Sequence, residues 1–69
     1  MKYFLPEEIK ELRLYLGLDQ TEFGSLVGCT KAAVCRWESG DRRPLFNPMV
    51  KLNEIWTQAR KKQAQEMMP

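Results

Sequence analysis

The stretch that decides the fold is QTEFGSLVGCTKAAVCRWESG, residues 20–40, whose pattern predicts two short helices joined by a tight turn. Asp19 and Glu22 have the Asp-x-x-Glu spacing of a capping box, which satisfies two unpaired backbone N–H groups where a helix begins. Gly28 is placed to end that helix in a left-handed turn, and the Thr30 hydroxyl is placed to cap the next helix. The two helices are therefore separated by only two residues.

Apolar residues in the two segments recur at helical spacing, so each helix has one face to bury against the other. They are Phe23 and Val27 in the first segment, then Val34 and Trp37 in the second. Gly24 lies in mid-helix, where glycine costs about 1 kcal/mol relative to alanine. We therefore expect the backbone of the second helix, or Val34, to approach closely there. This is the packing pattern of a helix-turn-helix.

The ordered set of motif residues resembles the DNA-binding domain of the phage repressor and Cro family, also called XRE. The resemblance rests on Gln20, Gly24, Gly28, Val34 and Trp37-Glu38-Ser39-Gly40, with Ile9, Leu12, Arg13, Leu16, Gly17 and Leu18 upstream and Arg42, Arg43 and Pro44 downstream. It covers more than half of the chain and implies an all-α, lambda-repressor-like helix-turn-helix bundle of four or five helices that binds double-stranded DNA. One alternative stays open, a helical hairpin in a small bundle without a nucleic-acid partner.

Length and composition limit the other possibilities. A chain of 69 residues makes one domain, residues 1–69, and buries only about 60% of its unfolded surface, which favours a homodimer. No apolar run is long enough for a membrane span or signal sequence, so we expect a cytoplasmic protein. Two cysteines without histidine exclude the usual zinc sites, and no cofactor or metal is expected. Without a histidine base or an activated nucleophile, we do not expect an enzyme.

The segments flanking the motif predict two further helices. Pro6 fits the first turn of a helix that ends near Gly17. Asn47 and Pro48 fit the N-cap and first residue of a long helix over about residues 48–65. Family members commonly carry a short fifth helix, which this continuous helix replaces, so the dimer geometry stays open. The apolar segment at residues 1–5 either covers the core or frays.

Arg13 lies on the edge of the apolar stripe of the first helix, where a cation needs a carboxylate partner. Glu38 is the candidate, and the resemblance implies an ion pair at these two positions that ties the first helix to the second motif helix. The alternative is two solvated charges. Leu14 and Tyr15 depart from the family, which usually carries polar residues at these positions.

We expect the base-reading residues on the outward face of the second motif helix, whose first residues lie nearest the base edges in the major groove. These are Lys31, Ala32, Cys35 and Arg36. Lys31 and Arg36 have N–H groups to donate to guanine O6 and N7, while Ala32 is small enough to contact a thymine methyl group. The alternative for both cations is phosphate neutralisation without base reading.

Four more residues are expected at the DNA backbone. Gln20 begins a helix whose N–H groups attract a phosphate, and the Thr30 hydroxyl is shared between capping and a phosphate. Arg43, with Arg42 beside it, resembles the family residue that follows the backbone or enters the minor groove.

The function that these features favour is a small Cro-like repressor that binds a palindromic operator as a homodimer, because one helix reads too few base pairs alone. An alternative is an antitoxin-type module that holds a toxin protein through Leu14, Tyr15 and the Trp56 helix while the motif binds DNA.

Overall fold

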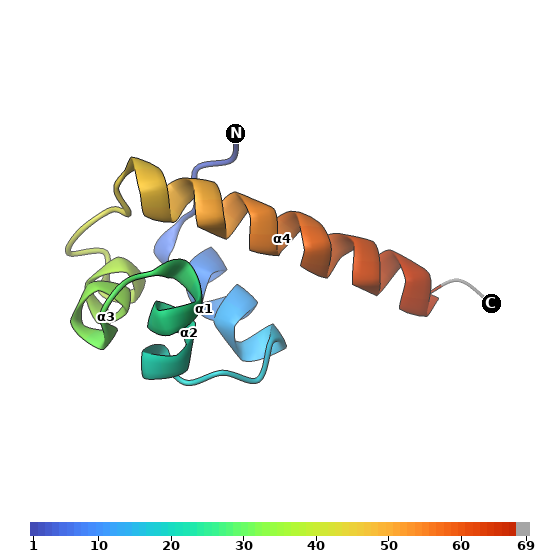
Figure 1. The fold of residues 1–69 in the computed structure, drawn as a ribbon, viewed down its shortest axis with the longest axis horizontal. Helices are drawn as coiled ribbons and strands as arrows, with labels where there is room; N and C mark the ends of the chain where they lie inside the picture. Colours follow the sequence, from blue (N-terminus) through green and yellow to red (C-terminus); the bar gives the residue numbers. More distant parts are fainter. Residues whose placement is uncertain (68–69) are drawn as a thin grey trace.

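Four helices make up the part of the chain that the computed structural model describes, residues 1–67 (Figure 1). They are α1 (Pro6–Tyr15), α2 (Gln20–Val27), α3 (Lys31–Ser39) and α4 (Phe46–Met67). This arrangement confirms the expected all-α helix-turn-helix bundle. No helix in the described part combines the length and hydropathy that a membrane span requires.

The core lies where α1, α2 and α3 meet the first two thirds of α4. Phe23, Val34 and Leu52 have no exposed surface, and Ile9 is 1% exposed. The rest of the buried set is Phe4, Leu12, Val27, Trp37, Met49 and Ala59. Ala59 is the last buried residue of α4, and the side chains of residues 60–64 are exposed. The helix therefore continues past the body formed by the other three (Figure 1).

The bounds of α4 correct our prediction, because the helix begins at Phe46 rather than Pro48 and ends at Met67 rather than near residue 65. The Met49 N–H donates to the Leu45 carbonyl over 2.9 Å, which closes the first turn two residues early. Pro48 is tolerated inside that turn, since the first N–H groups of a helix have no intrahelical partner anyway. Asn47 is thus a helical residue and not the N-cap.

The N-terminal segment, residues 1–5, covers the core. Phe4 is 7% exposed, and its ring meets that of Trp56 edge to face with centroids 6.1 Å apart. The Lys2 N–H donates to Asn53 Oδ1 over 2.8 Å, and Asn53 Nδ2 donates back to the Lys2 carbonyl over 3.0 Å. This segment, which we call the arm, is therefore fastened to α4 by contacts between residues far apart in sequence.

Candidate nucleic-acid interface

The predicted caps are present, with a capping box where α2 begins, Gly28 where α2 ends and Thr30 where α3 begins. Asp19 Oδ1 accepts the Glu22 N–H over 2.8 Å, and Glu22 Oε1 accepts the Asp19 N–H over 3.0 Å. Gly28 has φ 75°, the left-handed conformation that suits glycine. Thr30 Oγ1 then accepts the Ala33 N–H over 3.2 Å. Local hydrogen bonds thus set the direction in which α3 leaves the turn.

Gly24 allows the turn to fold back against α2. A Cβ atom at this position would lie 2.7 Å from the Cys29 carbonyl oxygen and 3.1 Å from the Thr30 carbonyl carbon. The close approach that we predicted is confirmed, but its partner is the backbone of the turn and not Val34. The Cys29 N–H also donates to the Gly24 carbonyl over 2.7 Å, which holds the two segments together.

The outward face of α3 carries the four residues expected to read bases. Val34 and Trp37 are buried on the opposite face of the helix, being 0% and 5% exposed. At about 100° per residue, the outward side chains cover a strip of roughly 140° around the helix. That strip is exposed along its whole length and comprises Lys31, Ala32, Cys35 and Arg36.

Arg13 and Glu38 lie in contact and join α1 to the end of α3. Arg13 Nε is 2.7 Å from Glu38 Oε2, and Arg13 Nη2 donates to Glu38 Oε1 over 3.0 Å. The third donor, Arg13 Nη1, reaches the Leu18 carbonyl at 3.1 Å. The two side chains are 12% and 7% exposed, so the pair is largely shielded from water. Its hydrogen bonds raise the pKa of Arg13 above the ordinary value, because Glu38 favours the charged guanidinium.

Gln20 joins the same network through its side chain. Its Nε2 donates to Glu38 Oε1 over 3.3 Å, so the amide is directed at the ion pair. An amide nitrogen carries two hydrogens, and a phosphate contact would use the second one or the backbone N–H at the start of α2. Thr30 is exposed and accepts the capping hydrogen bond while its own hydroxyl hydrogen is still a donor.

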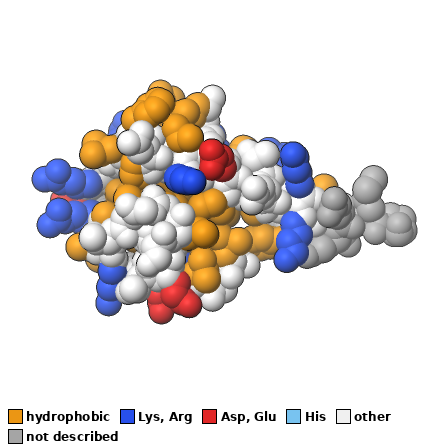
Figure 2. Space-filling view, in the orientation of Figure 1, with side chains coloured by type: hydrophobic (Ala, Val, Ile, Leu, Met, Phe, Trp, Pro, Cys, Tyr) orange, Lys and Arg blue, Asp and Glu red, His pale blue; other side chains and the backbone are white. Residues whose placement is uncertain are grey.

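The loop after α3 is tied back onto that helix. The backbone N–H groups of Asp41 and Arg42 both donate to the Arg36 carbonyl, over 3.0 and 3.2 Å, and Gly40 has φ 83°. This is a glycine-based helix stop, which the Ser39-Gly40 sequence signals but which our sequence reasoning did not connect to Arg36. The side chains of Arg42 and Arg43 are exposed beside the end of α3. Lysine and arginine side chains gather at this end of the molecule (Figure 2).

The two cysteines are free thiols in different surroundings. Cys29 is partly buried in the turn, and burial raises the pKa of its thiol. Cys35 is exposed on the outward face of α3. Within residues 1–67, no group of three or more His, Cys, Asp or Glu side chains is arranged to hold a metal ion.

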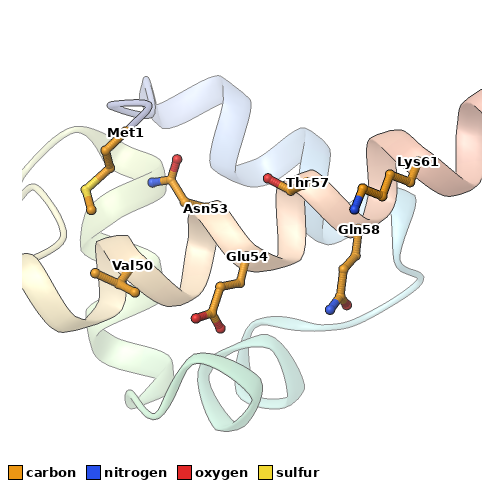
Figure 3. Close-up of a pocket in the computed structure, with 7 residues that line it drawn as sticks. All are labelled: Met1, Val50, Asn53, Glu54, Thr57, Gln58 and Lys61. Carbon is orange, nitrogen blue, oxygen red and sulfur yellow. The ribbon is translucent and has the colours of Figure 1, made fainter.

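A hollow of about 480 Å³ lies along α4, away from this face of α3 (Figure 3). Met1 of the arm lines one end of it, and every other lining residue belongs to α4: Val50, Asn53, Glu54, Thr57, Gln58 and Lys61. No residue of α2, α3 or their turn contributes. The basic outward face of α3 and the hollow on α4 are therefore separate features.

Comparisons with known proteins agree with this geometry. A protein-family model described as helix-turn-helix matches residues 9–55, from α1 into the middle of α4. No curated protein and no solved structure matches the chain. The matched range contains every residue that we placed at the interface with DNA.

Proposed function

The chain belongs to this helix-turn-helix family, whose XRE-type members are DNA-binding transcription regulators, and we propose that it is a small Cro-like repressor that binds a palindromic operator as a dimer. Two observations support this proposal: the match to the helix-turn-helix family and the exposure of the outward face of α3. A repressor of this kind acts by occupying its operator.

The observation that carries the proposal is the separation of the two faces of α3. Its apolar face is locked by Val34 and Trp37 against the bundle, while Lys31 and Arg36 are exposed on the other side. A helix fixed in this way fits the major groove with its cations and small residues toward the base edges. Arg36 is the sharper candidate for base reading, since an arginine can donate two hydrogen bonds to guanine.

The phosphate contacts surround that face. Gln20 and Thr30 lie at the N-terminal ends of α2 and α3, where N–H groups attract anions. Arg42 and Arg43 follow the C-terminal end of α3. The Arg13–Glu38 pair takes no direct part but holds the first and third helices in register, so that donors on α2 and α3 meet the same backbone.

The test is selection of bound sequences from random duplex DNA, with the wild type, Arg36→Ala and Lys61→Ala compared. Lys61 lies on α4 away from α3. Lys61→Ala removes one positive charge, as Arg36→Ala does, so it is the matched control. We expect a symmetric consensus for the wild type and Lys61→Ala. Arg36→Ala should lose preference at one base position in each half-site, by about 1 to 3 kcal/mol.

Other outcomes separate the alternatives. A uniform loss of affinity across sequences would assign Arg36 to phosphate, and an unchanged consensus with unchanged affinity would remove it from the interface. Affinity should also fall steeply with salt, because each neutralised phosphate releases bound cations. A protein that binds no duplex at low salt would contradict the proposed function altogether.

A second candidate function is the antitoxin-type module, which one observation favours. Leu14 is 57% exposed and Leu26 is 48% exposed. A hollow of about 440 Å³ lies between the ends of α1 and α2 and the middle of α4, and its lining residues are Tyr15, Leu16, Leu26, Ile55, Gln58, Ala59 and Lys62. Isolation of the protein from its host would test this function. A stoichiometric partner lost on Leu26→Ser substitution supports it, and a protein isolated alone opposes it.

A further inference from the structure

A hollow of about 260 Å³ lies where the arm meets the end of α3, the loop after it and the first turn of α4, and we call it the arm hollow. Phe4, Trp37 and Met49 line it and are buried members of the core. Tyr3 and Leu5 of the arm also line it and are largely exposed. A cavity of about 150 Å³ holds benzene. The arm hollow therefore has room for one aromatic ring with a short substituent, beside three aromatic side chains that favour stacked or edge-to-face contact.

The charged groups that line the arm hollow are positive. Arg42 and Arg43 line it, and no acidic residue of the described chain does. Neither guanidinium group forms an ion pair within residues 1–67, and the neighbouring Asp41 forms none there either. Hydrophobic side chains border the cluster of lysine and arginine at this end of the molecule (Figure 2). Because a guanidinium group donates two parallel hydrogen bonds to a carboxylate, the arm hollow is complementary to an apolar molecule that carries one carboxylate.

The same two arginines line a second hollow, on the side of α3. This hollow of about 240 Å³ also includes Arg36, which we expect to read a base, and Leu45 of the loop. Arg42 and Arg43 thus form a wall between the arm hollow and the expected interface with DNA. A guanidinium group that pairs with a carboxylate in the arm hollow has its charge neutralised there, so it attracts a phosphate on the other side less strongly.

We propose that the arm hollow binds a small aromatic carboxylate, and that this ligand weakens the contact of Arg42 and Arg43 with the DNA backbone. The second half of the inference rests on the proposed function, in which both arginines contact phosphate. The ligand acts as an inducer, because it neutralises the two positive charges and so releases the repressor from its operator. Linkage requires the converse effect, and bound DNA should lower the affinity for the ligand by the same factor.

Ligand binding is tested without DNA, by calorimetric titration of the full chain with 3-phenylpropionate. We expect one molecule to bind per chain with a Kd of roughly 1 mM or lower. The neutral 3-phenylpropionamide lacks the charge and acetate lacks the ring, so each should bind at least about tenfold more weakly. Arg42→Ala/Arg43→Ala should abolish binding of 3-phenylpropionate. The matched control, Lys61→Ala/Lys62→Ala, removes two positive charges from an exposed part of α4 and should leave binding unchanged.

The effect on DNA binding is tested with the duplex that the wild type selects, at several salt concentrations. Saturating 3-phenylpropionate should lower the affinity of the wild type and reduce the slope of log K against log salt by about 2, because two phosphate contacts are weakened. Arg42→Ala/Arg43→Ala should show the reduced slope without the ligand and no further response to it. Tyr3→Ala removes one wall of the arm hollow, so it should weaken ligand binding about fivefold and leave the affinity for DNA unchanged without the ligand.

Different results would overturn the two halves of the inference. No binding of 3-phenylpropionate at millimolar concentration, equal binding of the neutral amide, or binding that survives in Arg42→Ala/Arg43→Ala would each overturn the ligand site. Ligand binding that leaves the affinity for DNA and its salt dependence unchanged would overturn the role as inducer. A wild type that binds 3-phenylpropionate but no duplex would refute the proposed function, and with it the role as inducer, while the ligand site would stand.

Discussion

The α2–α3 pair and α4 are both helical, but they are held in place by different kinds of contact. Around the turn, each decisive hydrogen bond or close approach joins residues no more than six apart, as in Asp19 with Glu22 or Gly24 with Cys29. The packing of α4 instead involves the arm, whose Lys2 is 51 residues from its hydrogen-bond partner Asn53. The motif is thus specified by neighbours in sequence, and α4 by the other end of the chain.

The difference matters for function because the two regions have different tasks. The α2–turn–α3 unit must present Lys31 and Arg36 in a fixed direction, and short-range contacts set the direction in which α3 leaves the turn. The arm and α4 complete the core, to which the arm contributes Phe4 and α4 contributes Met49, Leu52 and Ala59. The largest effects of substitution should therefore fall inside the turn, and smaller ones at the arm.

Gly24→Val tests the tightest contact of the motif. The new Cβ would lie 2.7 Å from the Cys29 carbonyl oxygen, a backbone atom that cannot move without shifting the turn. We expect the free energy of unfolding to fall by more than about 3 kcal/mol, as for severe overpacking. Chemical denaturation measures it. Ser25→Val places the same β-branched residue at an exposed neighbouring position of α2 and should cost less than about 1 kcal/mol. Equal losses in the two variants would show that the close approach is unimportant.

Phe4→Ala tests whether α4 depends on the arm. The ring is 7% exposed and packs on Trp56, so its removal should cost about 3 kcal/mol, near the lower end for a buried phenylalanine because it lies at the edge of the core. Tyr3→Ala removes an aromatic side chain that is 81% exposed and should change stability by less than about 0.5 kcal/mol. Thermal denaturation of both variants measures these losses of stability. A stable Phe4→Ala protein would mean that α4 packs without the arm.

The sequence predicted the motif well because its signals are local. A capping box, a left-handed glycine and a capping threonine each act within a few residues, and all three were found where the spacing placed them. The bounds of α4 were predicted less well. Pro48 looked like the first helical residue, although proline is equally acceptable slightly later in the first turn, and only the Leu45–Met49 hydrogen bond distinguishes the two.

The candidate site was predictable where helical periodicity decides exposure. Val34 and Trp37 had to face inward, which left Lys31, Ala32, Cys35 and Arg36 outward. Among contacts that depend on tertiary geometry, the Arg13–Glu38 pair was predicted because the family resemblance named both partners, and others were not predictable. Nothing near Gln20 in the sequence indicates that its amide binds Glu38, and nothing near Lys2 indicates Asn53. The predicted partner of Gly24 was wrong for the same reason. The position of a glycine in mid-helix indicates that another part of the chain approaches closely, but it does not indicate which atoms do so.

Arg13→Ala measures how strongly the motif is joined to α1. Glu38 is 7% exposed beside Arg13 and would lose both of its hydrogen bonds to the guanidinium group, while Gln20 would still donate to it. Breaking a well-shielded ion pair by removing one partner lowers the free energy of unfolding by about 3 to 5 kcal/mol. We expect a loss of about 2 kcal/mol here because the Gln20 amide still donates a hydrogen bond to Glu38. Lys10→Ala, an exposed cation on the same helix, is the control and should be near neutral. Denaturant titration measures the stability of both variants. If Arg13→Ala is as stable as Lys10→Ala, the Arg13–Glu38 pair contributes no more than two solvated charges would.

Glu8→Gln should have the smallest effect and tests the charge that holds the arm. Glu8 accepts hydrogen bonds from Lys2 Nζ over 2.6 Å and from the Leu5 N–H over 2.8 Å, and these hold the pKa of its carboxyl below the ordinary 4.5. A lowered pKa in the folded state stabilises the protein at higher pH, and the stabilisation is lost as the pH falls below 4.5 through the folded value. Near pH 7 the free energy of unfolding of the wild type should therefore exceed that of Glu8→Gln by less than about 1 kcal/mol, as for an exposed ion pair. This difference should disappear in acid. Glu7→Gln removes the same charge from the same turn, so unfolding curves at several pH values should show a gap that closes in acid only for Glu8→Gln. If both variants follow one curve, the arm is held by Phe4 and Asn53 alone.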